Sequence, residues 1–446
     1  MLQNLFISSL SFFDTLMIGQ LGAVQIAAVG LANQMFFLIM LFFFGVSSGS
    51  SIFIAQFWGN NDIKSIHKTM GIGLILSLTG AGFFTVISVA APEFIMSIFS
   101  SDKAVIEVGA VYLRIVGISY LFSAVSITFS AALRSTEQTQ TPLIATVFSL
   151  IVNIILNYLL IFGKFGFPEL GVAGAAIATT IARGLELFIM LLITYKRKLT
   201  AAGSITSFLA IDNSFLPVFF NIALPVILNE MVWALGMVVY KIVYARMGTQ
   251  VIASANVVEA IQGLFFVIFI GTANGCAVMI GKKIGERDHD AARLYAKKFC
   301  FLALEVGTAI GIMMYFSAPV IPKAFQVSPE IVFLSSRSLM SLAFILPIKA
   351  FNMHSIIGIL RSGGDTRTSL FIELSSVWLV GVPLAIIGGL VLHLPIYYLY
   401  LLISIEEVYK SILSLFRIRS GKWINDLTKA VSDEPLIVEI SGSEIP

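Results

Sequence analysis

The stretch that decides the fold is residues 24–56, which read VQIAAVGLANQMFFLIMLFFFGVSSGSSIFIAQ and contain no charged side chain. A helix crosses the hydrocarbon layer of a bilayer with about 20 apolar residues. This stretch is longer than that, so it predicts a transmembrane helix that tilts or protrudes into water.

The rest of the chain is also rich in apolar residues and poor in charged ones. Of its 446 residues 58% are hydrophobic and 12% are charged, whereas soluble domains carry roughly 25% charged residues. So few charged side chains cannot cover a surface in water, and lipid favours helices because they satisfy their own backbone. We therefore predict an all-α membrane protein with about twelve transmembrane helices. The predicted spans are 1–19, 24–56, 68–91, 104–133, 142–163, 170–195, 216–245, 250–281, 298–318, 331–360, 368–391 and 395–416.

Lysine and arginine are distributed unevenly between the two sides of these spans. Most lie after even-numbered spans or in the C-terminal tail, whereas the opposite loops hold only Lys103, Lys164, Arg246 and Lys323. Because basic loops stay in the cytoplasm, we expect both termini to be cytoplasmic. The expected location is the plasma membrane, which in a bacterium is the inner membrane.

The sequence also contains an internal repeat. Leu133-Arg134-Ser135 recurs in the second half as Leu360-Arg361-Ser362. Five further positions recur there at one shared offset, namely Gly22, Gly45, Gly49, Gly59 and Asp62 as Gly248, Gly271, Gly275, Gly285 and Asp288.

The repeat predicts four parts: a six-helix lobe at 1–195, a cytoplasmic linker at 196–215, a second six-helix lobe at 216–417 and a polar cytoplasmic tail at 418–446. Six is an even number, so both lobes enter the membrane in the same sense. We therefore predict a pseudo-twofold axis along the membrane normal, with a cavity between the lobes. The first span is two or three turns shorter than its counterpart, so either the chain starts upstream or this helix is truncated.

Asp14 is the main candidate for function, because an ionisable group at membrane depth costs roughly 2.5–3.5 kcal/mol. It is the only acid in the first span, and its repeat counterpart is Tyr240, so the architecture does not require it. Apolar surroundings favour a neutral carboxyl group, which suits Asp14 to bind and release a proton. With amide and hydroxyl oxygens around it, Asp14 could instead hold Na⁺.

Such oxygens are available on three other spans. Asn153 and Asn157 share one face of the fifth span, Thr179 lies in the sixth and Asn33 in the second. The alternative interpretation is ordinary interhelical hydrogen bonding by the amides.

Glu230, Glu259 and Tyr240 are the candidates for substrate binding or a second ion site in the second half. Glu259 is the repeat counterpart of Asn33, and Glu230 lies in the seventh span. The alternative for Glu259 is a structural ion pair with Lys241. Arg183 and Glu186, three residues apart on one helix face, are expected to pair.

Catalytic and cofactor motifs are weak. Gly45-Val46-Ser47-Ser48-Gly49 matches the nucleophile elbow, but it lies inside a predicted helix, and its copy at 271–275 loses the serine. Close helix packing through G-x-x-x-G explains both copies better. The cysteines and histidines lack metal-ligand spacing and there is no Walker motif. We expect no enzyme activity, no cofactor and no nucleic-acid partner.

The chain resembles the multidrug and toxic compound extrusion (MATE) transporters. The matching stretches are Phe13–Gly22, Ala131–Ser135 with Thr139 and Pro142, Asn153–Gly163 and Gly171–Thr179. The resemblance implies an antiporter that exports cationic amphiphilic drugs or metabolites in exchange for Na⁺ or protons by alternating access. We expect it to be a monomer, with an apolar, aromatic substrate cavity.

The resemblance also implies site residues. It assigns a first-lobe cation site to Asp14, Asn153, Asn157 and Thr179, and it makes Glu230 the counterpart of a seventh-span glutamate in other members. Those members also carry an acid in the tenth span, where residues 349–352 here have none. The first lobe is therefore favoured for the cation site.

Three other functions are weighed against the antiporter. A lipid-linked saccharide flippase on a related scaffold needs several basic side chains for pyrophosphate, and the predicted spans hold few, namely Arg114, Arg183, Lys241 and Lys349. An intramembrane enzyme needs a nucleophile with a base, or a metal set. A sensor without transport activity predicts no dependence on an ion gradient.

Overall fold

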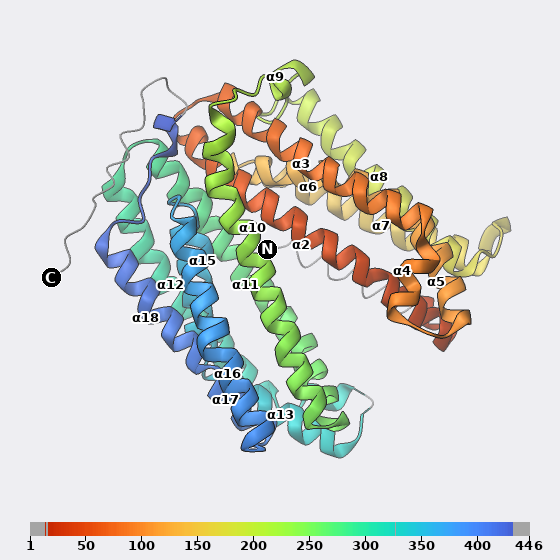
Figure 1. Cartoon of the computed structure of the whole chain (residues 1–446). Coiled ribbons are helices and arrows are strands. Elements are labelled where there is room, and N and C mark those ends of the chain that lie inside the picture. Colours follow the sequence, from red (N-terminus) through yellow and green to blue (C-terminus); the bar gives the residue numbers. More distant parts are fainter. Residues whose placement is uncertain (1–13, 15–16, 326, 431–446) are drawn as a thin grey trace.

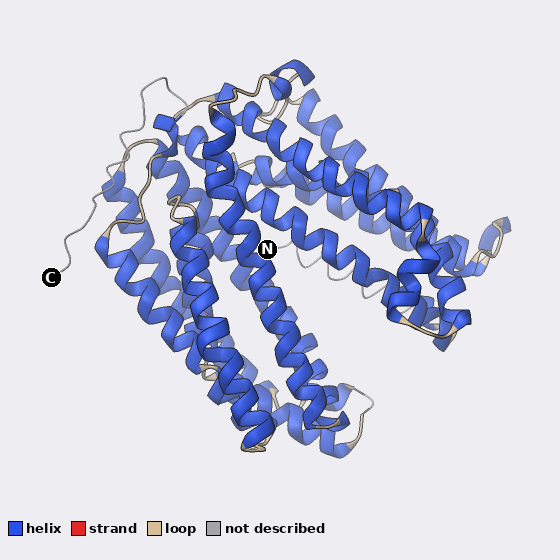
Figure 2. Cartoon of the chain, in the orientation of Figure 1, coloured by secondary structure: helices blue, strands red, loops and turns tan. Residues whose placement is uncertain are grey.

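The computed structural model describes residues 14, 17–325 and 327–430. Helices make up almost all of these residues, which form no strand (Figure 2). The first lobe contains α2 (Ala23–Gly59), α3 (Ile63–Ala90), α4 (Pro92–Phe99), α5 (Lys103–Val116), α6 (Ser119–Ser135), α7 (Gln140–Phe162) and α8 (Gly171–Lys196), and the linker contains α9 (Ile205–Leu209). The second lobe contains α10 (Phe215–Met247), α11 (Thr249–Gly285), α12 (His289–Ser317), α13 (Pro329–Ala343), α14 (Leu346–Met353), the π-helix η3 (His354–Arg361), α15 (Thr366–Ser375), the π-helix η4 (Ser376–Gly381), α16 (Val382–Ile386), the π-helix η5 (Ile387–Val391), α17 (Ile396–Ile403) and α18 (Ile405–Ser420).

Eight helices of the described residues are long and apolar enough to cross a membrane, or ten if each of two bent pairs counts as one span. The bent pairs are α5 with α6, at 49°, and α13 with α14–η3, at 58°. Each pair was predicted as one span, at 104–133 and 331–360. The second break precedes Pro347, which lacks the N–H that would continue the helix.

The two remaining predicted spans differ from the rest. Residues 1–19 lie mostly outside the described part of the chain. The prediction at 395–416 corresponds to α17 and α18, and α18 carries Glu406, Glu407 and Lys410. These charges make α18 far less apolar than α17, which carries none.

The helices form two lobes that diverge from one end of the molecule (Figure 1). At that end α2 of the first lobe packs against α10 and α11 of the second. This end also carries α9 and the basic loops that the charge rule assigns to the cytoplasm, and we call it the basic end. The two-lobe, all-helical prediction is confirmed.

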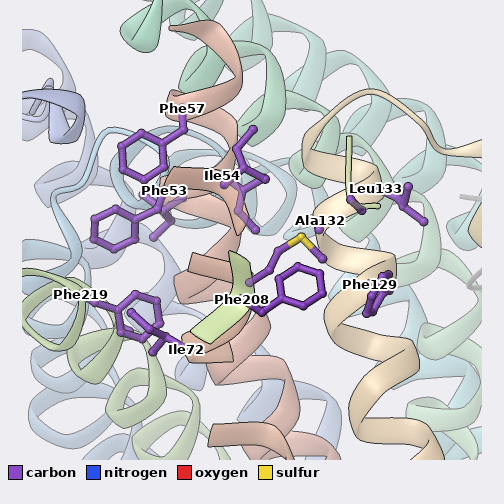
Figure 3. Packing of buried hydrophobic residues seen from close by; sticks show 14 of the residues in the cluster. Phe53, Ile54, Phe57, Ile72, Phe129, Ala132, Leu133, Phe208 and Phe219 are labelled. Carbon is purple, nitrogen blue, oxygen red and sulfur yellow. The ribbon is translucent and has the colours of Figure 1, made fainter. Parts of the chain in front are cut away.

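An aromatic cluster joins the lobes near the basic end (Figure 3). The ring of Phe53 on α2 lies 5.4 Å from that of Phe215 and 5.6 Å from that of Phe219, both on α10. Gly49 of α2 lies against Ala223 of α10, at a distance that leaves no room for a side chain on Gly49. Close packing through the first G-x-x-x-G copy therefore agrees with the prediction. Its counterpart Gly275 has no such neighbour within 4 Å, so there the prediction was wrong.

Polar contacts between the lobes follow the repeat. Gln56 and Lys282 are repeat counterparts, at the same offset as Gly59 and Gly285, and each reaches a turn of the opposite lobe. The Gln56 amide donates to the Ser362 carbonyl at 3.0 Å, and the Lys282 ammonium donates to Glu137 at 2.8 Å. Beside them, the two glycines bring the backbones of α2 and α11 into contact.

The predicted polar tail begins as a packed segment. Trp423 is 1% exposed, and the Leu427 N–H donates to the Gln56 side-chain oxygen at 2.8 Å. The residues after α18 therefore link the two lobes at the basic end.

Candidate ion-binding site

A chain of side-chain hydrogen bonds connects Asp14 to two helices of the first lobe. The Asn157 amide donates to Asp14 Oδ1 at 2.5 Å and also contacts Asn153 Oδ1 at 3.0 Å. The Asn153 amide in turn donates to Thr179 Oγ1 at 3.5 Å. The structure thus brings together four of the residues that the sequence singled out.

Local geometry explains why these groups meet. Asn153 and Asn157 are four residues apart on α7, so both point to one side of that helix. Thr179 belongs to α8, which packs closely along α7 because Gly174 lies against the Leu160 carbonyl. Both amides are fully buried.

A second layer of polar side chains surrounds the cluster. Arg183 pairs with Glu186 at 3.1 Å, as the sequence predicted, and Glu186 also accepts a hydrogen bond from Thr146 at 2.8 Å. The guanidinium of Arg183 lies close enough to Asp14 to act on its charge. Tyr112 of α5 lies beside Thr179 and Asp14, and sequence reasoning missed it because nothing local distinguishes it from other apolar-face tyrosines.

One oxygen of the cluster lacks a donor. The side-chain carbonyl of Asn157 is buried and has no hydrogen-bond partner in the described part of the chain. Buried polar atoms are almost always paired, so this oxygen is suited to a donor or cation that joins the site. A proton on Asp14 could supply such a donor. Na⁺ could instead be held by the oxygens of Asp14, Asn157 and Thr179.

The remaining predicted residues lie elsewhere. Asn33 of α2 is exposed, and no described side chain joins it to the Asp14 cluster through a hydrogen bond. Glu259 pairs with Lys241 at 2.9 Å, which agrees with the structural alternative. Glu230 pairs with Arg361 at 2.7 Å, so the seventh-span acid is already matched by a cation. Tyr240 donates a hydrogen bond to Glu406.

The whole chain has known relatives. The family model MatE matches residues 1–159 and 225–387, one block in each lobe. The chain belongs to the MatE family. It is 29% identical over 418 residues to the "Uncharacterized transporter YisQ" of Bacillus subtilis, covering 92% of this chain and 90% of that protein. It is 24% identical over 421 residues to the "Probable multidrug resistance protein NorM" of Thermotoga maritima, covering 92% and 88%.

Solved MATE transporters share the fold. An outward-facing multidrug resistance MATE family transporter of the MOP superfamily matches with a TM-score of 0.84 at 22% identity, over 95% of this chain and 94% of the other. A single-residue mutant of the Vibrio cholerae MATE transporter VcmN matches with a TM-score of 0.85 at 18% identity, over 95% of each chain. This MatE chain is therefore a multi-pass membrane transporter with the two-lobe fold of its family.

Proposed function

We propose that this MatE transporter is an antiporter that exports cationic amphiphilic compounds in exchange for a proton or Na⁺ bound at Asp14. The observation that carries the proposal is the Asp14–Asn157–Asn153–Thr179 cluster, in which both asparagines are buried and the Asn157 oxygen has no hydrogen-bond partner among the described residues. Membership of a transporter family and relatives named as probable multidrug resistance proteins support the export of drugs.

Coupling follows if ion and substrate compete for one conformational equilibrium. A charged Asp14 favours one arrangement of the lobes, and a neutralised Asp14 favours the other. A gradient of the ion then drives the substrate, because each ligand shifts the same two states. The lobes meet at the basic end, which supports an outward-facing state if that end is cytoplasmic.

The flippase alternative receives less support. Basic side chains in the predicted spans could bind pyrophosphate only if they were free. Three of the four named above form ion pairs: Arg183 with Glu186, Lys241 with Glu259, and Arg114 with Glu93 at 2.9 Å. Cations already matched by carboxylates are poor phosphate ligands, because the anion would have to displace their partners.

The test uses the full chain in proteoliposomes with a fluorescent organic cation as the transported probe. A sodium gradient and a pH gradient are imposed separately on wild type, on Asp14→Asn and on Glu330→Gln, which removes an exposed carboxylate in the first turn of α13. We expect one gradient to drive transport by wild type and by Glu330→Gln, and Asp14→Asn to abolish it. Transport that ignores both gradients, or that survives Asp14→Asn, would overturn the proposal.

A further inference from the structure

A buried group of charged side chains lies in the second lobe, away from the Asp14 site. The Lys410 ammonium of α18 lies 2.8 Å from Glu373 Oε1 of α15 and 3.8 Å from Glu406 Oε1 of its own helix. The side chains of Lys410 and Glu373 are each 7% exposed, and that of Glu406 is 5% exposed. Three charges thus share one buried position.

The second oxygen of Glu406 is held by a phenol. Tyr240 of α10 donates its hydroxyl to Glu406 Oε2. Gly381, the last residue of the π-helix η4, faces both groups, and a Cβ at this position would overlap the carboxylate oxygen and the phenol oxygen. Single-turn π-helical distortions are frequent at functional sites. A widened helix and a glycine therefore make the space that the Tyr240–Glu406 pair occupies.

The internal repeat relates this cluster to the Asp14 site. Tyr240 is the repeat counterpart of Asp14, at the offset that relates Gly22 to Gly248. The offset that relates Leu133 to Leu360 gives the other equivalences. By this offset Glu406 corresponds to Thr179, Lys410 to Arg183 and Glu373 to Thr146. In the loop before the last span of each lobe, Pro395 corresponds to Pro168.

The comparison reveals an exchange of chemistry between equivalent positions. In the first lobe the carboxyl group is on the first span and the hydroxyl is on the sixth, as Asp14 and Thr179. In the second lobe the hydroxyl is on the first span and the carboxyl group is on the sixth, as Tyr240 and Glu406. A cation follows four residues after the sixth-span position in both lobes, as Arg183 and Lys410.

The charges around Glu406 do not balance. Besides Glu373, Lys410 and Tyr240, the groups near Glu406 are Glu407 on its own helix and Tyr244 on α10. Glu407 acts on Glu406 and on Lys410, and Lys349 of α14 acts on Glu407. Three carboxyl groups therefore face two lysines. An unmatched charge in a low-dielectric interior is costly, so the cluster favours one additional proton.

Glu406 is the member best placed to take that proton. Glu373 has the close contact with Lys410, at 2.8 Å, whereas Glu406 lies 3.8 Å from it. The Asn352 amide donates to Glu407 at 2.7 Å and can only donate, which favours the charged form of that acid. The Tyr240 hydroxyl that donates to Glu406 can also accept, so that contact is compatible with a protonated Glu406. Ser414, one turn beyond Lys410, is fully buried and has no hydrogen-bond partner among the described residues.

We infer that Glu406 is a proton-binding carboxyl group of the second lobe, the chemical counterpart of Asp14 at the position that Thr179 occupies in the first. As a coupling site this inference rests on the proposed antiport. As a proton site it stands on the geometry alone. Each lobe then carries one carboxyl group able to take a proton: Asp14 on the first span of the first lobe and Glu406 on the sixth span of the second.

The first test measures protonation without transport. Infrared difference spectra of the full chain in lipid nanodiscs are recorded between pH 8 and about pH 5.5, above the range in which exposed carboxyl groups take up protons. The proteins compared are wild type, Glu406→Gln, Asp14→Asn and Glu330→Gln. We expect a protonated-carboxyl signal in wild type that loses one component in Glu406→Gln and a different one in Asp14→Asn. Glu330→Gln should match wild type. Spectra of Glu406→Gln that match wild type would overturn the inference.

A second pair of variants guards against misfolding. Glu406→Asp keeps the acid and should keep the signal at a shifted pH. The double variant Tyr240→Asp with Glu406→Thr copies the first-lobe arrangement into the second lobe, and it should restore a component that Glu406→Gln lacks. If neither variant shows the component, the inference fails.

Transport assays separate this inference from the proposed function. If protons drive export, the number of protons moved per substrate should fall to half in Glu406→Gln. A wild type that does not transport, but whose spectra lose a carboxyl component in Glu406→Gln, would sink the antiport and leave the proton site. If wild type and Glu406→Gln transport with the same number of protons per substrate, the antiport stands and Glu406 has no coupling role.

Discussion

At the residue scale, the amide of Asn157 is the group that most directly controls Asp14. It donates one hydrogen bond to the carboxylate and contacts the Asn153 oxygen, while its own oxygen has no partner among the described residues. A hydrogen bond to a charged group contributes about 1.5–3 kcal/mol. The strength of ion binding at Asp14 should therefore depend on this single side chain.

We predict that Asn157→Ala changes the apparent affinity for the coupling ion by about tenfold, since about 1.4 kcal/mol corresponds to tenfold in an equilibrium constant. The sign identifies the ion: the affinity for Na⁺ should fall because a ligand is lost, whereas the affinity for a proton should rise because the charged carboxylate loses a hydrogen bond. The maximal transport rate should change less, because Asp14 itself remains. The measurement is the initial transport rate as a function of ion concentration. Thr79→Ala, which removes an exposed hydroxyl bonded within α3, should behave as wild type. An unchanged affinity in Asn157→Ala would separate this amide from ion binding.

At the scale of elements, the crossing of α2 and α11 determines whether the basic end can close. Gly59 lies against the Lys282 carbonyl and Gly285 against the Gln56 carbonyl, at distances that leave no room for a Cβ atom. The repeat places both glycines at equivalent positions, so each lobe offers the same contact to the other. Without side chains at these two positions, the backbones of α2 and α11 can pack more closely than side chains would allow.

We predict that Gly285→Ala separates the lobes at the basic end. Alanine favours a helix by about 1 kcal/mol over glycine, so propensity alone would stabilise α11. The clash with α2 acts in the opposite direction and only on the contact between lobes. Distances between spin labels on α3 and α12 should lengthen in this variant.

Gly275→Ala provides the matched control for that prediction. It lies on the same helix, and a Cβ there meets nothing within 4 Å. Its label distances should match those of wild type. Equal distances in all three proteins would show that the glycine contact does not hold the basic end together.

At the scale of the whole molecule, an exposed ion pair bridges the lobes beside the glycines. The hydrogen bond from Lys282 holds the pKa of Glu137 below its ordinary value of 4.5, and Trp58 donates a further bond at 3.2 Å. A carboxyl group with a lowered pKa stabilises the contact above its ordinary pKa. That contribution is lost as the pH falls through the lowered value.

We predict that the basic end stays closed from neutral pH down to about pH 5 and loosens only in stronger acid. High salt should weaken the contact at neutral pH, because exposed pairs are screened. Label distances across the two lobes report both effects. Glu137→Gln should remove the acid dependence, and loosening between pH 6 and 7 would point to another titrating group.

The sequence by itself determined the architecture of this transporter. Long apolar runs, the side on which basic loops lie and a nearly constant repeat offset are properties of the chain that hold in any lipid-spanning arrangement. The same holds for residues close in sequence on one helix: Asn153 with Asn157, and Arg183 with Glu186, because helical spacing alone places them together.

Only the tertiary structure decided which polar side chains far apart in the sequence pair with one another. Glu230 with Arg361, and Tyr240 with Glu406, are far apart in the chain, and helix packing alone brings them together. The exposed position of Asn33 also follows from packing rather than spacing. Because the energy of a buried charge depends on every group that faces it, the balance around Glu406 could be counted only once α10, α14, α15 and α18 were in place.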